Sequence, residues 1–380
     1  MHIVIDGNEA NIVQRVGSNV YAFELLAALE KITRDRVDVK FTVVLSAQPI
    51  PDLPPVRKGW QYQAIGPTKF WTQWALPWYL YQNRAQIDVF FTPGHYAPRI
   101  TSVPYVSSVM DVAYHYFPQQ FRFSDYLQLS MWTKFSVKQA AKIIAISQST
   151  LRDVVKVYRR KAEDIAVAYP AVVGNQRPVS PIKAQAIIRK FKVKVPYFLY
   201  VGTLQPRKNL VNLISAYEVY RDQVQTAGIK SAPKQLVLAG KIGWLADAIL
   251  AQAEKSRYKD EIIFTGFISD SEKKALYSVA TASILVGIYE GFGMPPLESL
   301  ALGTIPVVAN SSSLPEVVGD AGILVDPLDP AKIADGLMQA ATLKLSQKQE
   351  WKSKAAKQVA RFSWEKSAQV VLDTLLEVAR

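Results

Sequence analysis

The stretch YEGFGMPPLESLALG, residues 289–303, decides how the rest of the chain is interpreted. The apolar run ASILVGIY at 282–289 leads into it and predicts a buried strand. Two prolines follow the glycine-containing turn, and proline suits the first turn of a helix, where its missing N–H would have no partner anyway. We therefore predict a helix from about Pro296 to about Leu302.

Two carboxylates flank the start of this predicted helix. Glu290 lies in the loop before it, and Glu298 is expected in its first turn. Carboxylates accept hydrogen bonds from sugar hydroxyls, and the N–H groups of a glycine-rich turn at a helix start attract phosphate. The pattern favours a polyhydroxylated, phosphorylated ligand. The plain alternative is that Glu298 is an ordinary glutamate on a helix surface.

The same stretch contains a weak dinucleotide-binding pattern. Gly291 and Gly293 follow a strand, but Pro296 occupies the third glycine position of G-x-G-x-x-G. The next predicted strand, IPVVAN, ends in Asn310 and not in the acidic residue that would bind a ribose. We therefore do not favour a dinucleotide site.

Length and composition indicate a multidomain globular protein. The 380 residues are 49% hydrophobic and their mean hydropathy is +0.04, as expected for two or three domains. The longest apolar runs are about eight residues, well short of the ~20 that a membrane-spanning helix needs. Cysteine is absent, so thiol chemistry and cysteine-based metal sites are excluded and a cytoplasmic location is expected.

The chain carries a net charge of +13, spread evenly over both halves. A basic surface can serve nucleic acid, anionic lipid or a phosphorylated substrate. No recognition helix, zinc finger or RNA-binding aromatic pattern accompanies the charge. We therefore expect no nucleic-acid partner.

Short apolar segments alternate with helical segments in both halves, which predicts parallel sheets flanked by helices. An N-terminal domain is predicted over 1–175, a linker over 176–195 and a second domain over 196–361. The predicted strands are 3–6, 39–45, 88–92, 105–110, 142–147 and 164–169 in the first half, and 197–201, 235–239, 262–265, 282–289, 305–310 and 322–325 in the second.

The first half offers one candidate site residue, Asp111, at the end of a predicted strand. In a doubly wound sheet such a residue faces the ligand crevice. A helix is predicted to begin near Gly17 and to present Val20, Phe23 and Leu26 or Ala27 on one face. The three histidines, His2, His95 and His115, match no metal motif. We expect no metal site.

Two further segments of the first half can be interpreted either as ordinary structure or as membrane contacts. Trp71, Trp74 and Trp78 recur at helical spacing, which favours a buried helix face, while an interfacial membrane patch is the alternative. Residues 134–161 are rich in lysine and arginine. A solvated face is the default there, and contact with anionic lipid is the alternative.

In the second half, Arg207 and Lys208 lie where a helix is predicted to start near Asn209. Paired cations at a helix start suit a diphosphate, and each charge-assisted hydrogen bond contributes roughly 1.5–3 kcal/mol. A solvated loop is the alternative. The loops at 241–244 and 266–268 leave their strands at the same sheet edge, so all of these segments are expected to converge on Glu290 and Glu298.

The chain resembles the family 4 retaining glycosyltransferases, and among them the mannosyltransferase-like group of bacterial surface polysaccharide assembly. The most specific matches are the Glu-x7-Glu spacing of Glu290 and Glu298, VGTLQPRKN (201–209), GKIGW (240–244), SSLPEVVGDAGILVDPLDP (312–330) and FSWEKSA (362–368). The resemblance implies a GT-B fold, with two Rossmann-like domains and an active site in the cleft between them. It places the helix of 362–380 on the N-terminal domain, which would bind the acceptor, while the second domain would bind a nucleotide-sugar.

The resemblance also implies roles for individual residues. Glu298 would bind the ribose and Glu290 the donor sugar, and Asp111 is the candidate for orienting the acceptor. The diphosphate would meet Arg207 and Lys208. The remaining donor-binding residues would be Gly17 at the diphosphate, Phe267 and Ile268 at the nucleobase, and Gly291, Phe292, Gly293 and Met294 at the sugar.

The activity implied is metal-independent transfer of a hexose, with retained configuration, to a lipid-linked or polysaccharide acceptor. GDP-mannose is the favoured donor, and peripheral contact with the inner face of an anionic membrane stays open as the alternative for the basic segment. Met110 stands where the family usually has histidine, and Val286-Gly287 where it usually has Pro-Ser. A non-catalytic nucleotide-sugar-binding protein and a glucan- or sucrose-type synthase are the alternatives.

Overall fold

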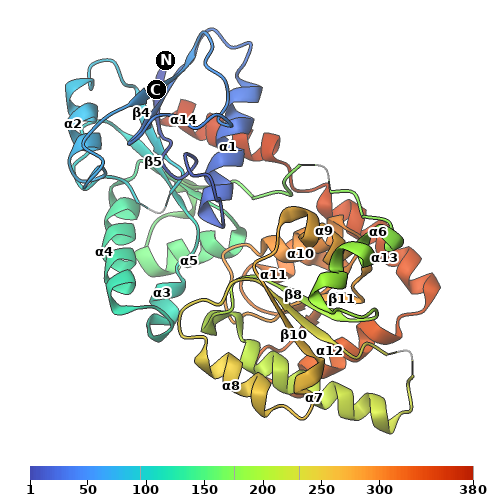
Figure 1. Ribbon diagram of the computed structural model, residues 1–380. Coiled ribbons are helices and arrows are strands. Elements are labelled where there is room, and N and C mark those ends of the chain that lie inside the picture. Colours follow the sequence, from blue (N-terminus) through green and yellow to red (C-terminus); the bar gives the residue numbers. More distant parts are fainter. Residues whose placement is uncertain (95, 175, 231, 380) are drawn as a thin grey trace. The chain divides into compact units, whose positions relative to one another are not determined.

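The computed structural model describes residues 1–94, 96–174, 176–230 and 232–379. These residues form two compact units, one comprising Met1–Pro170 with Phe362–Arg380 and the other Ala171–Arg361 (Figure 1). Each unit is a parallel sheet with helices on both faces. No helix among the described residues combines the length and the apolar character needed to cross a bilayer.

The first unit has a seven-stranded sheet in the order β3-β2-β1-β4-β5-β6-β7, in which all pairs are parallel. Its central strands are buried on both faces, as continuous apolar runs predict. The strands are β1 His2–Asp6, β2 Lys40–Leu45, β3 Trp60–Ala64, β4 Val89–Thr92, β5 Tyr105–Val109, β6 Lys142–Ala145 and β7 Ile165–Val167. The helices are α1 Ser18–Ile32, α2 Ala75–Gln82, α3 Ala113–Tyr116, α4 Phe123–Gln139, α5 Gln148–Tyr158 and α14 Trp364–Val378.

The second unit has a six-stranded parallel sheet in the order β10-β9-β8-β11-β12-β13. The chain leaves the centre in one direction through β8, β9 and β10 and returns on the other side through β11, so the strand order reverses between β8 and β11. The strands are β8 Phe198–Val201, β9 Leu236–Ala239, β10 Ile262–Gly266, β11 Ala282–Leu285, β12 Ile305–Ala309 and β13 Ile323–Val325. The helices are α6 Pro181–Ile188, α7 Leu210–Thr226, α8 Asp247–Lys255, α9 Asp270–Val279, α10 Met294–Ala301, α11 Leu314–Val318, α12 Pro330–Thr342 and α13 Leu345–Val359.

Every strand predicted from the sequence is present, and one strand, β3, was missed. β3 reads WQYQA and only Trp60 is fully buried, so it lacks the apolar run of the other strands. The strand predicted over 282–289 is too long, because β11 ends at Leu285 and the chain then enters a loop. The helix predicted from Pro296 begins two residues earlier, at Met294, because Gly293 adopts a positive φ of 101° that turns the chain into it.

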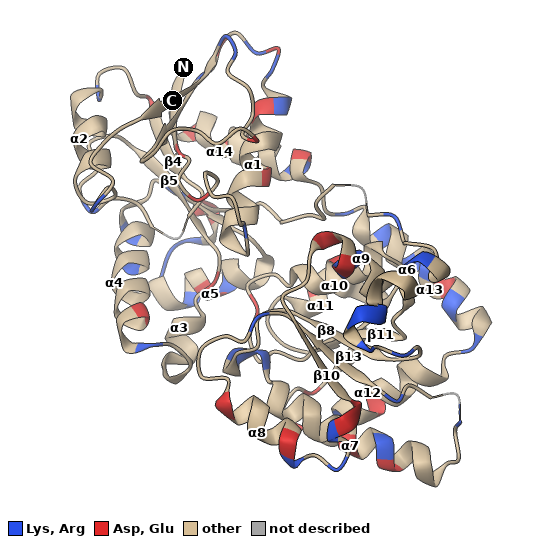
Figure 2. Cartoon of the chain, in the orientation of Figure 1, with Lys and Arg blue, Asp and Glu red and all other residues tan. Residues whose placement is uncertain are grey.

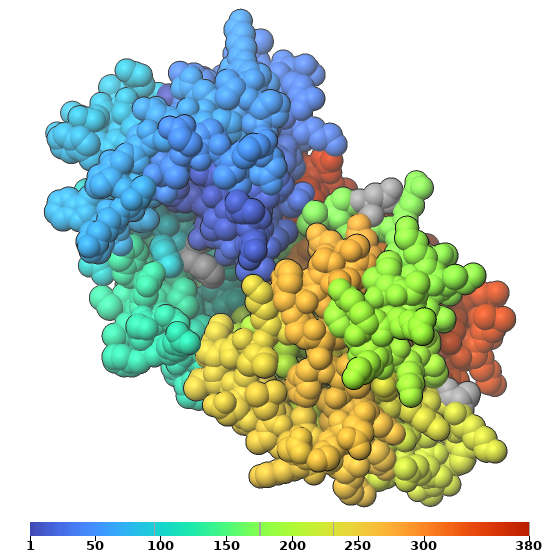
Figure 3. Space-filling view, in the orientation of Figure 1, coloured from blue at the N-terminus to red at the C-terminus, as the bar shows by residue number. Residues whose placement is uncertain are grey.

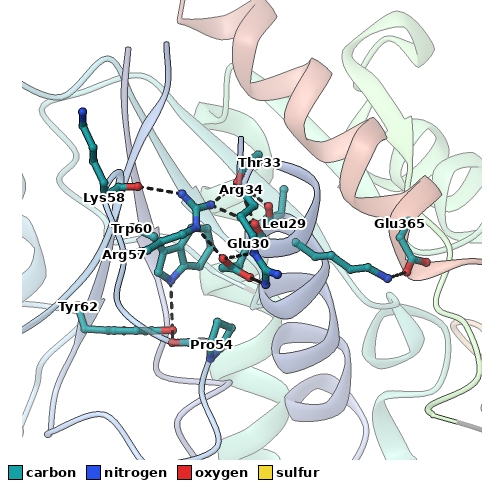
Figure 4. A network of polar contacts seen from close by, with 11 residues as sticks. Leu29, Glu30, Thr33, Arg34, Pro54, Arg57, Lys58, Trp60, Tyr62 and Glu365 are labelled. Carbon is teal, nitrogen blue, oxygen red and sulfur yellow. Dashed lines mark hydrogen bonds and ion pairs between the residues drawn. The ribbon is translucent and has the colours of Figure 1, made fainter. Parts of the chain in front are cut away.

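A buried carboxylate explains how the edge strand β3 is held. Glu30 of α1 is 3% exposed and pairs with Arg34 at 2.8 Å and with Arg57 at 2.6 Å (Figure 4). The Arg57 backbone N–H donates to the Trp60 carbonyl, at the start of β3. Although burial opposes it, hydrogen bonds from the two arginines lower the pKa of Glu30 below its ordinary value. This ion-pair network ties α1 to the edge of the sheet.

The C-terminal helix α14 packs against α1 within the first unit. Lys31 and Glu365 join the two helices through an ion pair of 2.7 Å (Figure 4), and Lys142 pairs with Glu377 at 2.9 Å. The segment 176–195, which we expected to be a linker, forms part of the second unit. It contains α6, which packs on α9 and contributes Ala184 and Ile188 to the core of the second unit.

The apolar face predicted for α1 is only partly buried in the structure. Leu26 is buried, whereas Val20, Phe23 and Ala27 are half-buried, because the helix turns Tyr21, Ala22 and Leu25 inward. The tryptophan segment is not a buried helix face. Trp71 is buried, whereas Trp74 is 70% and Trp78 60% exposed, because α2 begins only at Ala75 and buries Leu76, Tyr79 and Leu80.

Candidate functional site

The candidate site lies where the strand order of the second sheet reverses, between β8 and β11. In open parallel sheets, ligands bind at such points, beyond the carboxyl ends of the strands. The loop after β8 carries Arg207 and Lys208 in a short 3₁₀ turn, and the loop after β11 carries Glu290. The topology therefore brings the predicted cations and the first predicted carboxylate to one edge.

The two loops are joined by a buried ion pair. Lys208 Nζ lies 2.7 Å from Glu290 Oε1 and 2.9 Å from Oε2, so the ammonium contacts both carboxylate oxygens. Glu290 is only 7% exposed. A buried charge is tolerated only when it is paired and hydrogen-bonded. The pair thus makes a fixed, compact charge arrangement at the sheet edge.

Gly287 provides the space for this pair. A Cβ at this position would lie 2.8 Å from Glu290 Oε1, which is too close. The Val286-Gly287 departure from the family pattern therefore has a structural consequence. The space beside residue 287 is taken by the Glu290 carboxylate.

Backbone hydrogen bonds also connect the two loops. Ile288 N–H donates to the Arg207 carbonyl at 3.2 Å, and the Asn209 side chain donates to the Val286 carbonyl at 3.1 Å. Asn209 has a positive φ of 58° and directly precedes α7. These contacts fix Arg207 and Lys208 relative to Glu290.

Two serines after β12 hold the loop that carries Glu290. The Glu290 N–H donates to Ser312 Oγ at 2.9 Å. The Ser313 hydroxyl lies 2.8 Å from the Glu290 carbonyl oxygen and 2.7 Å from that of Phe292. Sequence reasoning missed both serines, and the signal available was the run Ser311-Ser312-Ser313 directly after a predicted strand.

Gly293 begins α10 with a close approach to a neighbouring helix. A Cβ there would lie 2.6 Å from Leu314 Cδ2, and its φ of 101° disfavours other residues. The Phe292 side chain is buried beneath the loop, while Met294 is half-buried at the first position of the helix. The predicted Gly291–Met294 turn is therefore a tight, packed helix start.

Glu298 is the fifth residue of α10, not a first-turn residue as expected, because the helix begins at Met294. It is also not an ordinary surface glutamate, since it is 7% exposed. Lys273 Nζ of α9 donates to its Oε1 at 2.6 Å. Burial raises the pKa of Glu298, and the Lys273 ammonium opposes that shift. Sequence reasoning missed Lys273, which lies 25 residues earlier in the chain.

The proposed nucleobase residues lie after β10. Phe267 is 64% exposed, and Lys241 Nζ lies 4.9 Å from the centre of its ring. Ile268 is partly buried and packs against the core. An exposed aromatic ring at a sheet edge can stack on a planar ligand, so Phe267 is available for such a contact.

The first unit supplies the two remaining candidates, each in a loop at the carboxyl edge of its own sheet. Gly17 has a φ of 54° and immediately precedes α1. Asp111 follows β5, and its Oδ1 accepts a hydrogen bond of 2.9 Å from the Ala113 N–H. Met110, in the position where histidine was expected, is buried.

The histidines have no metal-binding arrangement in the described part of the chain. His2 contacts the Gln86 carbonyl at 2.9 Å and Thr42 Oγ1 at 2.8 Å, which is a structural role. His115 is exposed, and His95 lies outside the described residues. Among the described residues no group of three or more His, Cys, Asp or Glu side chains is placed to hold a metal ion.

Two protein-family profiles together match most of the chain. The profile described as "Glycosyl transferases group 1" matches residues 182–371, and that described as "Glycosyltransferase Family 4" matches residues 16–173. The chain belongs to the family 4 glycosyltransferases. The predicted family is therefore confirmed.

Relatives of this glycosyltransferase include two bacterial mannosyltransferases. It is 29% identical over 235 residues to O-antigen chain mannosyltransferase B of Escherichia coli, a match that covers 60% of this chain and 59% of that protein. It is 26% identical over 309 residues to O-antigen chain mannosyltransferase RfbU of Salmonella typhimurium, with 80% of each chain covered. The chain thus spans about three fifths of the length of the first relative.

Solved structures confirm the GT-B fold of the glycosyltransferase. HepE of Anabaena, solved in complex with UDP and glucose, has a TM-score of 0.72 at 19% identity, with 98% of each chain covered. WaaG, a glycosyltransferase involved in lipopolysaccharide biosynthesis, has a TM-score of 0.68 at 14% identity, with 98% of this chain and 99% of that chain covered.

Proposed function

We propose that this glycosyltransferase moves a hexose from a nucleoside diphosphate sugar to a lipid-linked or polysaccharide acceptor, with retained configuration and without a metal ion. The observation that carries the proposal is the buried Lys208–Glu290 pair at the reversal point of the second sheet. The mannosyltransferase relatives favour mannose and hence GDP-mannose as the donor. The complex of HepE with UDP and glucose supports a nucleotide-sugar as the ligand class.

The donor would be held by the second unit. Glu298 accepts hydrogen bonds from the ribose hydroxyls, and Phe267 with Ile268 lines the base. The backbone of the Gly291–Met294 turn approaches the sugar and Glu290 binds its hydroxyls. The two carboxylates offer acceptors for hydroxyl groups, the turn offers N–H donors, and the Phe267 ring offers a surface on which a base can stack.

Arg207 and Lys208 would neutralise the diphosphate as it leaves. The bond between the sugar C1 and the phosphate oxygen breaks, and the acceptor hydroxyl forms its new bond to C1 on the same face. A phosphate oxygen of the leaving group takes the hydroxyl proton. Fixed positive groups aimed at developing charge typically contribute ~3–4 kcal/mol each, and Glu290 stabilises the cationic sugar.

The acceptor would be handled by the first unit. Asp111 orients the attacking hydroxyl by accepting a hydrogen bond from it, and the Gly17 backbone supports the diphosphate. Because a phosphate oxygen of the leaving group takes the proton, no protein side chain is assigned as a general base.

A donor panel tests the function. Release of nucleoside diphosphate from GDP-mannose, UDP-glucose and UDP-galactose is measured with and without lipid-linked oligosaccharide, glucan and free sugar. We expect one donor to react faster with a lipid-linked or polysaccharide acceptor, activity that survives EDTA, and an α-linked product from an α-linked donor. Binding without release would favour a nucleotide-sugar-binding protein, and transfer to glucan or free sugar would favour a synthase.

A surface of the first unit supports a peripheral membrane contact. Phe123, Leu127 and Met131 recur at intervals of four residues on the exposed face of α4, and Lys134 and Lys138 continue the same face. Figure 2 shows basic segments on α4 and α5, and Figure 3 shows the surface of residues 1–170 of this unit in blue to green. An apolar stripe followed by cations suits an anionic bilayer surface.

Vesicle binding tests this contact. The protein is co-sedimented with vesicles of phosphatidylglycerol and, as a control, phosphatidylcholine. We expect binding to the anionic vesicles that weakens with salt and is lost when Leu127 and Met131 are changed to serine. Equal sedimentation of the parent with and without anionic vesicles at low salt would contradict a membrane contact.

A further inference from the structure

Lys273 occupies an unusual place for a lysine. It lies on α9, whose start is fixed by a capping box between Ser269 and Glu272. The side chain of Asp270, three residues earlier on the same helix, is 91% exposed, whereas that of Lys273 is only 21% exposed. Lysine is rarely buried to this degree unless it is paired. Its position therefore requires a reason.

The reason visible in the structure is Glu298. Lys273 Nζ lies 2.6 Å from Glu298 Oε1 and 3.5 Å from Asp270 Oδ1. Within the described part of the chain, no group bonds Glu298 Oε2, although this carboxylate is 7% exposed. One oxygen is thus fixed by the lysine, and the other is left for a hydroxyl donor.

We propose that Lys273 is a positioning residue for nucleotide binding, which keeps Glu298 ionised and leaves Oε2 to accept hydrogen bonds from the ribose hydroxyls. This inference rests on the proposed function, because it assumes a nucleotide at Glu298. It adds to that function a residue which lies outside the Glu-x7-Glu pattern and on a different helix.

Electrostatics supports this role. A buried carboxylate without a cation becomes neutral over a wide range of pH, because burial disfavours its charged form. Two other groups of α9 affect the pKa of Glu298, which Asp270 raises and Lys274 lowers. The nearby Tyr277 hydroxyl donates to the Pro295 carbonyl. Lys273, whose Nζ lies 2.6 Å from Glu298 Oε1, is the cation that contacts the carboxylate directly.

Replacement of Lys273 by methionine tests the inference. Affinities for GDP and UDP, and for their 2′-deoxy counterparts, are measured by calorimetry from about pH 6 to about pH 9. We expect K273M to weaken binding of the better nucleotide by about tenfold near pH 6. The loss shrinks as the pH rises, because Glu298 ionises, and the preference for ribose over 2′-deoxyribose shrinks near pH 6.

Three further variants test whether the effect depends on the charge of Lys273 and on its contact with Glu298. K273R retains the cation and is expected to bind as the parent does. In the E298Q background, K273M is expected to have no further effect, and this double variant also removes both buried charges should K273M alone fail to fold. K354M breaks an exposed pair of 2.7 Å with Glu350 on α13 and serves as the control.

The outcomes separate the inference from the proposed function. If K273M binds with the parent's affinity and pH profile, or weakens binding equally in the E298Q background, the role of Lys273 is overturned while the proposed function stands. If the parent binds neither nucleotide, the proposed function fails and the inference fails with it.

Discussion

Each of the two carboxylates of the Glu-x7-Glu pattern is nearly buried and paired with a lysine from another element. Glu290 is held by Lys208 and Glu298 by Lys273. Lone buried charges are costly, so the two lysines are what allow both acids to be buried. A ligand rich in hydroxyls and phosphate can share these charges when it binds.

At the scale of single residues, Arg207 gives the sharpest prediction for the diphosphate. R207A is expected to weaken binding of nucleoside diphosphates by roughly tenfold to a hundredfold, because a charge-assisted hydrogen bond contributes about 1.5–3 kcal/mol. Binding of the corresponding monophosphates changes little. Calorimetric titration of both ligands gives the comparison.

Arg257 provides the matched control for Arg207. Its side chain is exposed and pairs with Asp222 at 2.6 Å, so R257A is expected to bind both ligands as the parent does. An R207A variant that loses monophosphate and diphosphate binding equally would show that Arg207 does not contact the diphosphate.

The sequence could predict part of this site. Glu290, Glu298, Arg207 and Lys208 stand out because motif spacing and helix starts are local properties. Lys273 could not be predicted, because it lies 25 residues before Glu298 in the chain and meets it only in the folded protein. The same holds for contacts between the serines after β12 and the Glu290 loop, which depend on the alignment of neighbouring strands.

At the scale of elements, the start of α10 depends on Gly293. G293A is expected to destabilise the protein by about 1–3 kcal/mol, since the added methyl would meet Leu314 and the backbone conformation disfavours alanine. Thermal unfolding measures the loss. G228A is the control, since Gly228 also has a positive φ but has no atom within 4 Å of an added Cβ. Equal melting temperatures for G293A and G228A would contradict the packing argument.

The ion-pair network of Glu30 gives a second prediction for an element. E30Q leaves two arginines without their carboxylate, and breaking a buried pair in this way typically costs about 3–5 kcal/mol. Because the pKa of Glu30 lies below the ordinary 4.5, its contribution is present above that value and is lost as the pH falls through the lower, folded-state pKa.

Thermal melting as a function of pH measures this contribution. The difference between the parent and E30Q is expected to be largest near neutral pH and to shrink in acid. E350Q, at an exposed pair on α13, is the control. A difference that does not change with pH would contradict the role given to the Glu30 charge.

The same network shows why β3 escaped sequence prediction. Strands that are buried on both faces appear in the sequence as apolar runs, and their predicted bounds differ from the observed ones by only a few residues. β3 is an edge strand, and what holds it is a set of side-chain contacts to α1 and not an apolar pattern. Prediction from sequence therefore succeeded for elements that carry their own hydrophobic signal and failed for one that is held by partners distant in sequence.

At the scale of the whole molecule, the chain consists of two doubly wound units that together match the GT-B fold. The alternation of strands and helices was sufficient to predict two parallel sheets flanked by helices, because parallel strands require such connections, whereas the GT-B fold was implied by the family resemblance. The spacing of the tryptophans could not show that Trp74 and Trp78 are exposed, because a helical spacing does not tell which face of the helix is buried.

The central claim is that Glu290 and Glu298 bind one activated hexose donor. The most direct measurement compares donor affinity and nucleotide release for the parent, E290Q, E298Q and the double variant, with E350Q as control. We expect E298Q to lose donor affinity and E290Q to lose turnover by about a hundredfold, with folding preserved. If both amide variants keep the parent's affinity and turnover, the assignment of the site is wrong.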